Sequence, residues 1–186
     1  MELQQRIAEI KQRAAPIIYG NVSVNDMGQL ETRTNLLDSG VVEGYGVIWG
    51  VANSYGEKFI KGAFAKSIRE RGPNNGSQYE IKFLYQHNQA DALSLFDEIK
   101  EDEIGLYFRT KKLDDVDSAN RVIKQLRSGT LNNFSIGYDF VWEQMEVDST
   151  DNTIIIKEAK LFEISVVSIP SDMSTFAIRS KEQLED

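Results

Sequence analysis

From residue 41 onward the chain alternates short apolar runs with polar turns. The runs are rich in β-branched and aromatic residues, which favour strands over helices. Acidic and polar residues at Glu101–Glu103 and Asp148–Asn152 indicate two hairpin turns. The pattern predicts about seven strands, over Val41–Val51, Ile81–Tyr85, Leu93–Lys100, Ile104–Lys111, Phe134–Met145, Thr153–Leu161 and Glu163–Ile169.

Two segments between these runs space their apolar residues as helices do. Gly62–Arg71 carries Phe64 and Ile68 four residues apart and ends at Gly72-Pro73. Asp117–Ser128 also has one apolar face and ends at Gly129. The carboxylates predicted to cap the start of the second helix are those of Asp114, Asp115 or Asp117.

Seven short strands with two helices predict a mainly β, α+β domain. Periodicity alone allows either a sandwich or a barrel, and a closed barrel would leave no exposed sheet edge. We assign this domain to residues 41–179 and expect a charged, frayed tail over residues 180–186. Residues 1–40 predict an amphipathic helix that ends at Pro16 and an extended arm rich in turn formers.

Composition narrows the function classes. The 186 residues include 21 Lys and Arg against 29 Asp and Glu, a net charge of -8, which argues against a nucleic-acid footprint or binding to an anionic membrane. No apolar run approaches the roughly 20 residues of a membrane span, so we expect a cytoplasmic protein. The chain has no Cys and one His, which excludes thiolate chemistry and most zinc sites. We therefore expect no cofactor and no metal.

His87 is the only conventional imidazole base. It follows the apolar run Phe83–Tyr85, so the predicted strand delivers it at a rim where a cleft could use it. On composition alone, a structural or solvated histidine is the more common interpretation of a single histidine.

Ser135 begins a predicted strand after a tight polar turn, and Gly137 follows it two residues later. This arrangement can place a hydroxyl beside free backbone N–H groups, which an oxyanion hole requires. The competing interpretation is an ordinary strand serine next to a bulge glycine. The segment is not the Gly-x-Ser-x-Gly elbow of the α/β-hydrolases.

Glu163 lies among apolar neighbours. Strict alternation places Glu163, Ser165 and Val167 on one face of the strand, and Phe162, Ile164 and Val166 on the other. A carboxylate in such a place must be solvated, protonated or paired. Pairing with His87 would orient the imidazole as the acid of a serine triad does, whereas a surface glutamate is the alternative.

Taken in order, several segments resemble the prohead proteases of tailed bacteriophages. The resemblance runs from about Val41 to Arg179 and depends most on the Ser-Ile-Gly strand and the later Glu-Ile-Ser-Val-Val…Pro. Its segments are Gly44-Tyr45-Gly46-Val47, Gly62-Ala63-Phe64, Phe83–His87, Gly105-Leu106-Tyr107, Leu126–Leu131, Phe134–Tyr138 and Leu161–Val167 with Pro170. Asn88 and Ser171-Asp172 depart from the family pattern, which has Asp and Ala-Asn at these places.

The resemblance implies a closed or nearly closed β-barrel with a few packed helices, similar to the herpesvirus maturation proteases. It implies a serine endopeptidase that works in the host cytoplasm, inside the assembling procapsid. Its expected substrates are the scaffold or the scaffolding segment of the major capsid protein, and the protease itself. His87 matches the family histidine, Ser135 the nucleophile and Glu163 the acidic position, with Asp172 in reserve.

Two other interpretations stay open at this point. One is a catalytically inactive capsid-assembly module of the same fold, and the other is an unrelated Ser-His esterase on a β-barrel. Homodimerisation is compatible with the family resemblance, although no residue of the sequence demonstrates it.

Overall fold

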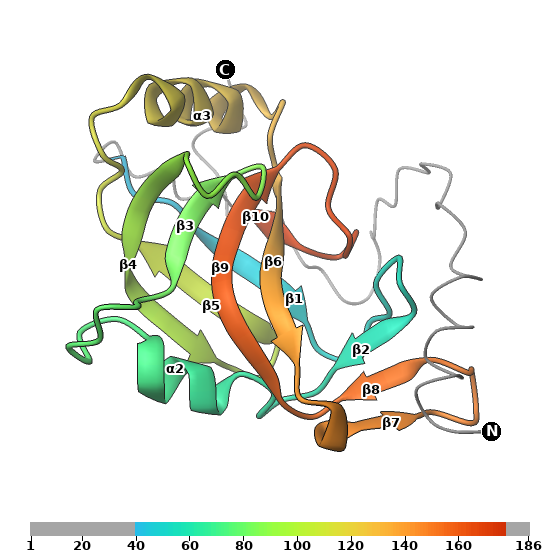
Figure 1. Cartoon of the computed structure of the whole chain (residues 1–186). Helices are drawn as coiled ribbons and strands as arrows, with labels where there is room; N and C mark the ends of the chain where they lie inside the picture. The colour runs from blue at the N-terminus through green and yellow to red at the C-terminus, as the bar shows by residue number, and fades with distance from the viewer. Residues whose placement is uncertain (1–39, 178–186) are drawn as a thin grey trace.

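The computed structural model describes residues 40–177, and a strongly bent seven-stranded sheet forms the centre of this part of the chain (Figure 1). Its strand order is β10-β1-β5-β4-β3-β9-β6. The N-terminal helix and nearly all of the arm predicted over residues 1–40, and the tail predicted over 180–186, lie outside the described residues. The strands of this sheet are β1 (Glu43–Ile48), β3 (Lys82–Tyr85), β4 (Ala92–Glu101), β5 (Gly105–Thr110), β6 (Asn133–Phe140), β9 (Ala159–Val167) and β10 (Phe176–Ala177).

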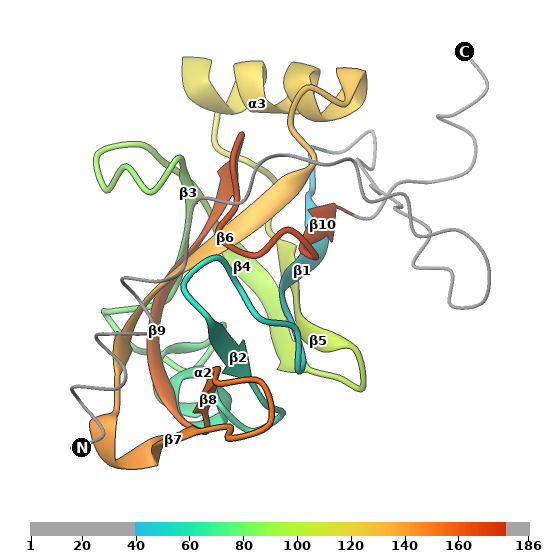
Figure 2. The same ribbon diagram turned by 90° about the vertical axis from the view of Figure 1, so that its right-hand side faces the viewer.

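The sheet is nearly closed where β6 approaches β10 and β1 (Figure 2). Side chains, rather than a full strand ladder, join this edge: the Thr175 hydroxyl accepts from the Phe134 amide at 3.2 Å and donates to the Phe134 carbonyl at 2.5 Å. The Asn133 side-chain amide donates to the Thr175 carbonyl at 2.6 Å. The predicted barrel-like α+β fold is therefore confirmed.

Aromatic side chains fill the interior. Phe83, Phe96, Phe108 and Phe134 come from four different strands and are all buried, and the rings of Phe108 and Phe134 lie edge to face at 4.8 Å. Burial of this one face of the sheet favours its curling around the four rings.

A second, three-stranded sheet of order β2-β8-β7 adjoins the barrel. It consists of β2 (Glu57–Phe59), β7 (Met145–Val147) and β8 (Ile154–Ile156). The buried Glu57 carboxylate accepts from the Tyr138 hydroxyl of β6 and from the Asn53 amide, which joins the two sheets.

Helix α3 (Asp117–Ser128) lies across one end of the barrel, with Ala119, Val122 and Leu126 buried (Figure 1). Its predicted bounds and its end at Gly129 are confirmed, and Gly129 has a left-handed backbone conformation. The predicted side-chain cap is wrong, because Val116 is the N-cap and no side chain bonds to the helix start. Asp117 is already in the first turn, where its charge favours the helix dipole without capping.

Three predicted strands are divided differently in the structure. Phe134–Met145 was expected as one strand, but β6 ends at Phe140 and a 3-10 turn (Trp142–Gln144) precedes β7. The expected strand Thr153–Leu161 contains both β8 and the start of β9, so the predicted break at Phe162 falls inside β9. The short strands β2 and β10 were not predicted. Apolar periodicity does not show where a chain passes from one sheet to the next.

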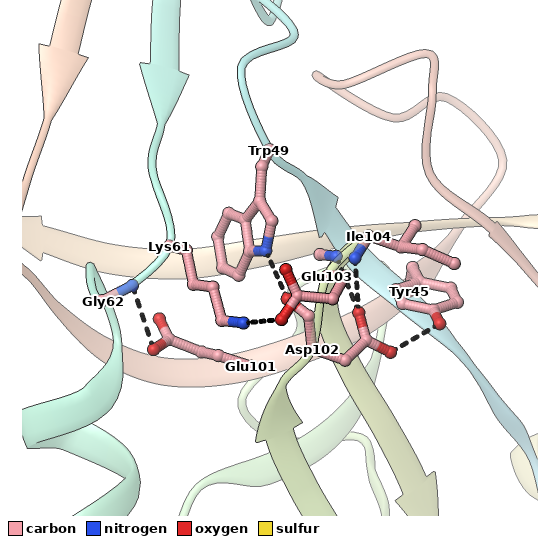
Figure 3. Close-up of polar contacts among 9 residues, drawn as sticks. Tyr45, Trp49, Lys61, Gly62, Glu101, Asp102, Glu103 and Ile104 are labelled. Atoms are coloured by element: carbon pink, nitrogen blue, oxygen red, sulfur yellow. Dashed lines mark hydrogen bonds and ion pairs between the residues drawn. The ribbon is translucent and has the colours of Figure 1, made fainter.

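The turn between β4 and β5 fastens helix α2 (Ala65–Arg71) to the barrel (Figure 3). Glu101 accepts the backbone N–H groups of Gly62 at 3.1 Å and Phe64 at 2.8 Å, so a carboxylate from a distant strand satisfies donors at the helix start. Asp102 accepts the Trp49 indole N–H on its carbonyl and the Tyr45 hydroxyl on its carboxylate.

We predict that Glu101→Ala lowers the free energy of unfolding by about 1 kcal/mol, because the backbone N–H groups of Gly62 and Phe64, just before α2, lose their carboxylate acceptor. The matched control is Glu103→Ala in the turn that follows, which removes only an exposed ion pair with Lys61 and should cost less than about 0.5 kcal/mol. Urea unfolding followed by circular dichroism measures both. Equal losses would contradict the role of Glu101 in fastening the segment before α2.

Candidate active site

The candidate site lies on the outer face of β3, β9 and β6. Phe134 and Ile136 of β6 turn toward the barrel interior, so Ser135 and Gly137 between them turn outward. In the paired strand β9, Ile164 and Val166 turn inward and Ser165 lies directly across from Ser135. Thus the packing of the barrel core itself places these polar positions on one common face of the sheet.

A bulge in β9 places Glu163 on this outer face. Gly137 pairs with Glu163, but the next residue of β6, Tyr138, pairs with Leu161, so Phe162 is an extra residue in β9. Leu161 is buried in the core, and without the extra residue Glu163 would point there too. The predicted alternation is therefore wrong for Phe162, which is 41% exposed and does not join Ile164 and Val166 in the core.

His87 is presented by a tight turn at the end of β3. Gln86 and His87 both have left-handed backbone conformations, with φ of 54° and 58°, which cost energy in residues other than glycine. Hydrogen bonds hold the turn: the Gln86 amide donates to the Val166 carbonyl at 3.0 Å, and the Asn88 amide donates to Tyr85 at 3.0 Å. The turn is thus tied to β9, the strand that carries Glu163.

The imidazole of His87 is paired with Glu163. His87 Nδ1 lies 2.6 Å from Glu163 Oε1, and the Glu163 side chain is almost buried while that of His87 is 44% exposed. The second carboxylate oxygen, Oε2, accepts the Ser165 hydroxyl at 2.6 Å. Because Nδ1 faces the carboxylate, Nε2 remains as the nitrogen available to act as a base.

The pairing shifts the protonation of His87. The hydrogen bond to Glu163 raises the pKa of His87 above its ordinary value; partial burial opposes the shift and coulombic attraction to Glu163 adds to it. A carboxylate that favours the protonated imidazole is what a histidine base needs when it takes a proton from a nucleophile.

Ser135 lies beside this pair without a hydrogen bond to it. The Ser135 residue is 4% exposed, and its hydroxyl lies 3.4 Å from that of Ser171 in the segment that connects β9 to β10. Its Cα partner Ser165 contacts both His87 and Glu163, so the three predicted residues gather around Ser165.

Asp172, the reserve candidate for the acid, is elsewhere. Its carboxylate accepts the backbone N–H and the hydroxyl of Ser174, and a backbone hydrogen bond from Ile48 also reaches it. Burial raises the pKa of Asp172, and these hydrogen bonds oppose the shift. The geometry therefore brings Glu163, and not Asp172, to the imidazole.

Sequence reasoning missed the part that Gly137 and Ser165 play. A Cβ atom at Gly137 would lie 2.4 Å from Glu163 Oε1, so only glycine leaves room for the carboxylate in its present position. Ser165 is fully buried and joins Glu163 to the turn at His87. The sequence shows that Gly137 and Ser165 lie two residues from Ser135 and Glu163, but it does not show the strand register that brings them into contact with the Glu163 carboxylate.

Among residues 40–177, no cluster of three or more His, Asp or Glu side chains is placed to hold a metal ion. Within the same range, no helix is long and apolar enough to cross a membrane.

A barrel that carries a paired histidine and carboxylate next to a serine has the arrangement of a serine hydrolase. Comparison with protein families gives the specific class. The sequence profile of the caudovirus prohead serine proteases matches residues 28–186, and the chain belongs to this family. The family resemblance seen in the sequence is confirmed, and the match begins within the segment assigned to the arm.

One similar solved structure is that of the bacteriophage T4 capsid assembly protease, gp21. The two structures superpose with a TM-score of 0.53 at 16% sequence identity, over 70% of this chain and 82% of that chain. At this identity the likeness establishes the shared fold. No curated protein sequence matches the chain.

We predict that nuclear magnetic resonance titration of His87, the only histidine, gives a pKa above about 6.5. The measurement is made in the Ser135→Ala background, which removes the predicted nucleophile. Glu163→Gln should return the pKa toward the ordinary value, whereas the control Asp172→Asn should leave it unchanged. The opposite pattern would identify Asp172 as the partner.

The same shift has a consequence for stability. Since the folded-state pKa is raised, pairing with the protonated imidazole stabilises the fold fully below about pH 6.5, and this contribution is lost as the pH rises through the folded-state pKa. In urea unfolding, the difference in free energy of unfolding between the parent protein and Glu163→Gln should shrink as the pH rises from about 6.5 through the folded-state pKa of His87.

We further predict that Gly137→Ala separates Glu163 from His87. The new Cβ overlaps Oε1, so the carboxylate must move and the pKa of His87 should fall as it does in Glu163→Gln. The control is Gly76→Ala, where no atom lies within 4 Å of the new Cβ and any cost comes from the backbone alone. An unchanged His87 pKa in Gly137→Ala would show that the carboxylate needs no such space.

Proposed function

We propose that this protein is a serine endopeptidase of prohead maturation in which Ser135 is the nucleophile, His87 the general base and Glu163 the residue that orients His87. The observation that carries the proposal is the contact of His87 Nδ1 with Glu163, on the sheet face that also carries Ser135. Family membership supports the proteolytic reaction, and the residue roles are argued from this geometry.

The surroundings of the buried serines favour Ser135 as the nucleophile. The Ser165 hydroxyl donates to Glu163 and accepts from the His87 amide, so its proton is directed at a carboxylate. The Ser67 and Ser94 hydroxyls donate to backbone carbonyls away from His87. The Ser135 hydroxyl makes a longer hydrogen bond, 3.4 Å to the Ser171 hydroxyl. Of these four buried serines, Ser135 therefore gives up the least when its hydroxyl turns toward His87.

In this mechanism, Ser135 Oγ attacks the scissile carbonyl while His87 Nε2 takes the hydroxyl proton. Glu163 stabilises the imidazolium, which then gives its proton to the leaving amine as the C–N bond breaks. Water, activated by the same imidazole, hydrolyses the acyl-enzyme and restores Ser135. Catalytic hydrogen bonds commonly tighten only when substrate binds, which accords with a structure in which the Ser135 hydroxyl bonds to Ser171 and not to His87.

We assign the protease to the host cytoplasm, inside the assembling procapsid, with the scaffold or the scaffolding segment of the major capsid protein as substrate. Support comes from the family description and from the neighbour described as a capsid assembly protease. The protease is itself a further expected substrate.

The test is the intact mass of the protein after treatment with a fluorophosphonate, which reacts with activated serines. We expect one adduct on the parent protein and none on Ser135→Ala or His87→Ala, because removing either group costs about 10⁴-fold or more in rate. The control Ser149→Ala, an exposed serine in the turn before β8, should label as the parent does.

Co-expression with the capsid protein and scaffold of the same phage then tests the substrate, with cleavage products identified by mass. An adduct that persists on Ser135→Ala would overturn the choice of nucleophile. Absence of both adduct and cleavage from the parent protein would favour the inactive assembly module, and labelling with cleavage of small esters alone would favour an esterase.

A further inference from the structure

Ser165 lies at the centre of the candidate site, yet it takes no part in the mechanism above. It is fully buried near the end of β9, between Leu84 of β3 and Ser135 of β6 in the strand register. A buried hydroxyl costs free energy unless it is hydrogen-bonded. Here both of its hydrogen-bonding functions are used within the site.

As a donor, the Ser165 hydroxyl binds Glu163 Oε2 at 2.6 Å, the carboxylate oxygen that does not face His87. With Oε1 against His87 Nδ1, each oxygen of the carboxylate has its own partner. A carboxylate held by both oxygens cannot rotate about its terminal bond without breaking one of two short hydrogen bonds. The Ser165 hydroxyl thus opposes the rotation that would turn Oε1 away from the imidazole.

As an acceptor, Ser165 Oγ binds the backbone N–H of His87 at 3.0 Å. That amide belongs to one of the two left-handed residues of the turn, whose conformation needs compensating contacts. One oxygen atom therefore touches the acid and the backbone of the base at the same time.

We propose that Ser165 is a positioning residue that fixes the Glu163 carboxylate against His87, a role that rests on the proposed function of His87 as the base. Ser165 does not touch the substrate. It sets the orientation of the acid, and through the acid the orientation and charge of the imidazole.

The pKa of His87 tests the proposal without any need for catalysis. It is measured by magnetic resonance in the Ser135→Ala background, where the single histidine gives an unambiguous signal. Ser165→Ala should lower the pKa toward about 6.5, and Ser165→Thr, which keeps the hydroxyl, should restore it. The control Ser94→Ala removes another nearly buried hydroxyl that lies away from Glu163 and should leave the pKa unchanged.

An unchanged or higher His87 pKa in Ser165→Ala would overturn the proposal, because the carboxylate would then keep its place without the serine. Thermal unfolding of each variant separates this effect from loss of the fold. If Ser165→Ala does not fold, Ser165→Cys replaces it: a thiol is a much weaker donor than a hydroxyl, so the His87 pKa should fall in this variant too, and an unchanged pKa would overturn the proposal.

A double-mutant cycle shows whether Ser165 acts through Glu163. In a Glu163→Gln background, adding Ser165→Ala should have little further effect on the His87 pKa. An equal shift in both backgrounds would mean that Ser165 acts on His87 by another route, which contradicts the proposal.

In the active protein, Ser165→Ala should reduce the rate of fluorophosphonate labelling by between about 10- and 100-fold, the usual effect of a displaced catalytic group. Ser165→Thr should recover most of the rate. If the parent protein does not label at all, the proposed function fails, whereas the pKa measurements still decide whether Ser165 positions Glu163.

Discussion

The candidate site depends on the placement of one carboxylate, that of Glu163. Its position is set by three separate features of the sheet: the extra residue Phe162 turns it outward, Gly137 leaves room for it, and Ser165 holds its second oxygen. Each of these three features acts through direct contact or local backbone geometry, and burial in the core alone would not place the carboxylate in the same position. An ionised carboxylate in a nearly buried place needs such partners, because desolvation would otherwise disfavour its charge.

The same strand register gives the site its rigidity. β9 lies between β3 and β6 and carries both Glu163, which pairs with His87, and Ser165, which lies opposite Ser135. These two residues are only two positions apart on the strand. The ladder between β9 and β6 therefore determines the spacing of Glu163 and Ser135, whereas His87 is carried by the turn at Gln86 and His87. The backbone energy stored in that turn is offset by hydrogen bonds to the same strand.

Much of the fold could be predicted from the sequence, since the barrel strands and α3 carry clear apolar periods. The failures occur where periodicity holds no information. The passage from β8 to β9 and the bulge at Phe162 change the course of the chain without interrupting its apolar pattern. The sequence narrowed the residue that pairs with His87 to Glu163 or Asp172. Choosing between these two required the strand register, which places Glu163, and not Asp172, beside β3. Ser165 looked like any strand serine, because its importance lies in contacts with a residue 78 positions away.

The segment that closes the barrel is also the one that lies against Ser135. Thr175 binds the backbone of Phe134, the residue before Ser135, and Ser171 covers the Ser135 hydroxyl. At the other end of the segment, Ser168 exchanges hydrogen bonds with the side chain of Gln86, next to His87. Both ends are therefore fastened near Ser135 and His87. The middle of the segment is held as well, because the Ser54 amide donates to the Ser171 carbonyl at 2.7 Å and a backbone hydrogen bond from Ile48 reaches the buried Asp172. The same eight residues of chain thus join the edges of the barrel and lie against Ser135, so the closure of the barrel and the surroundings of Ser135 depend on one segment.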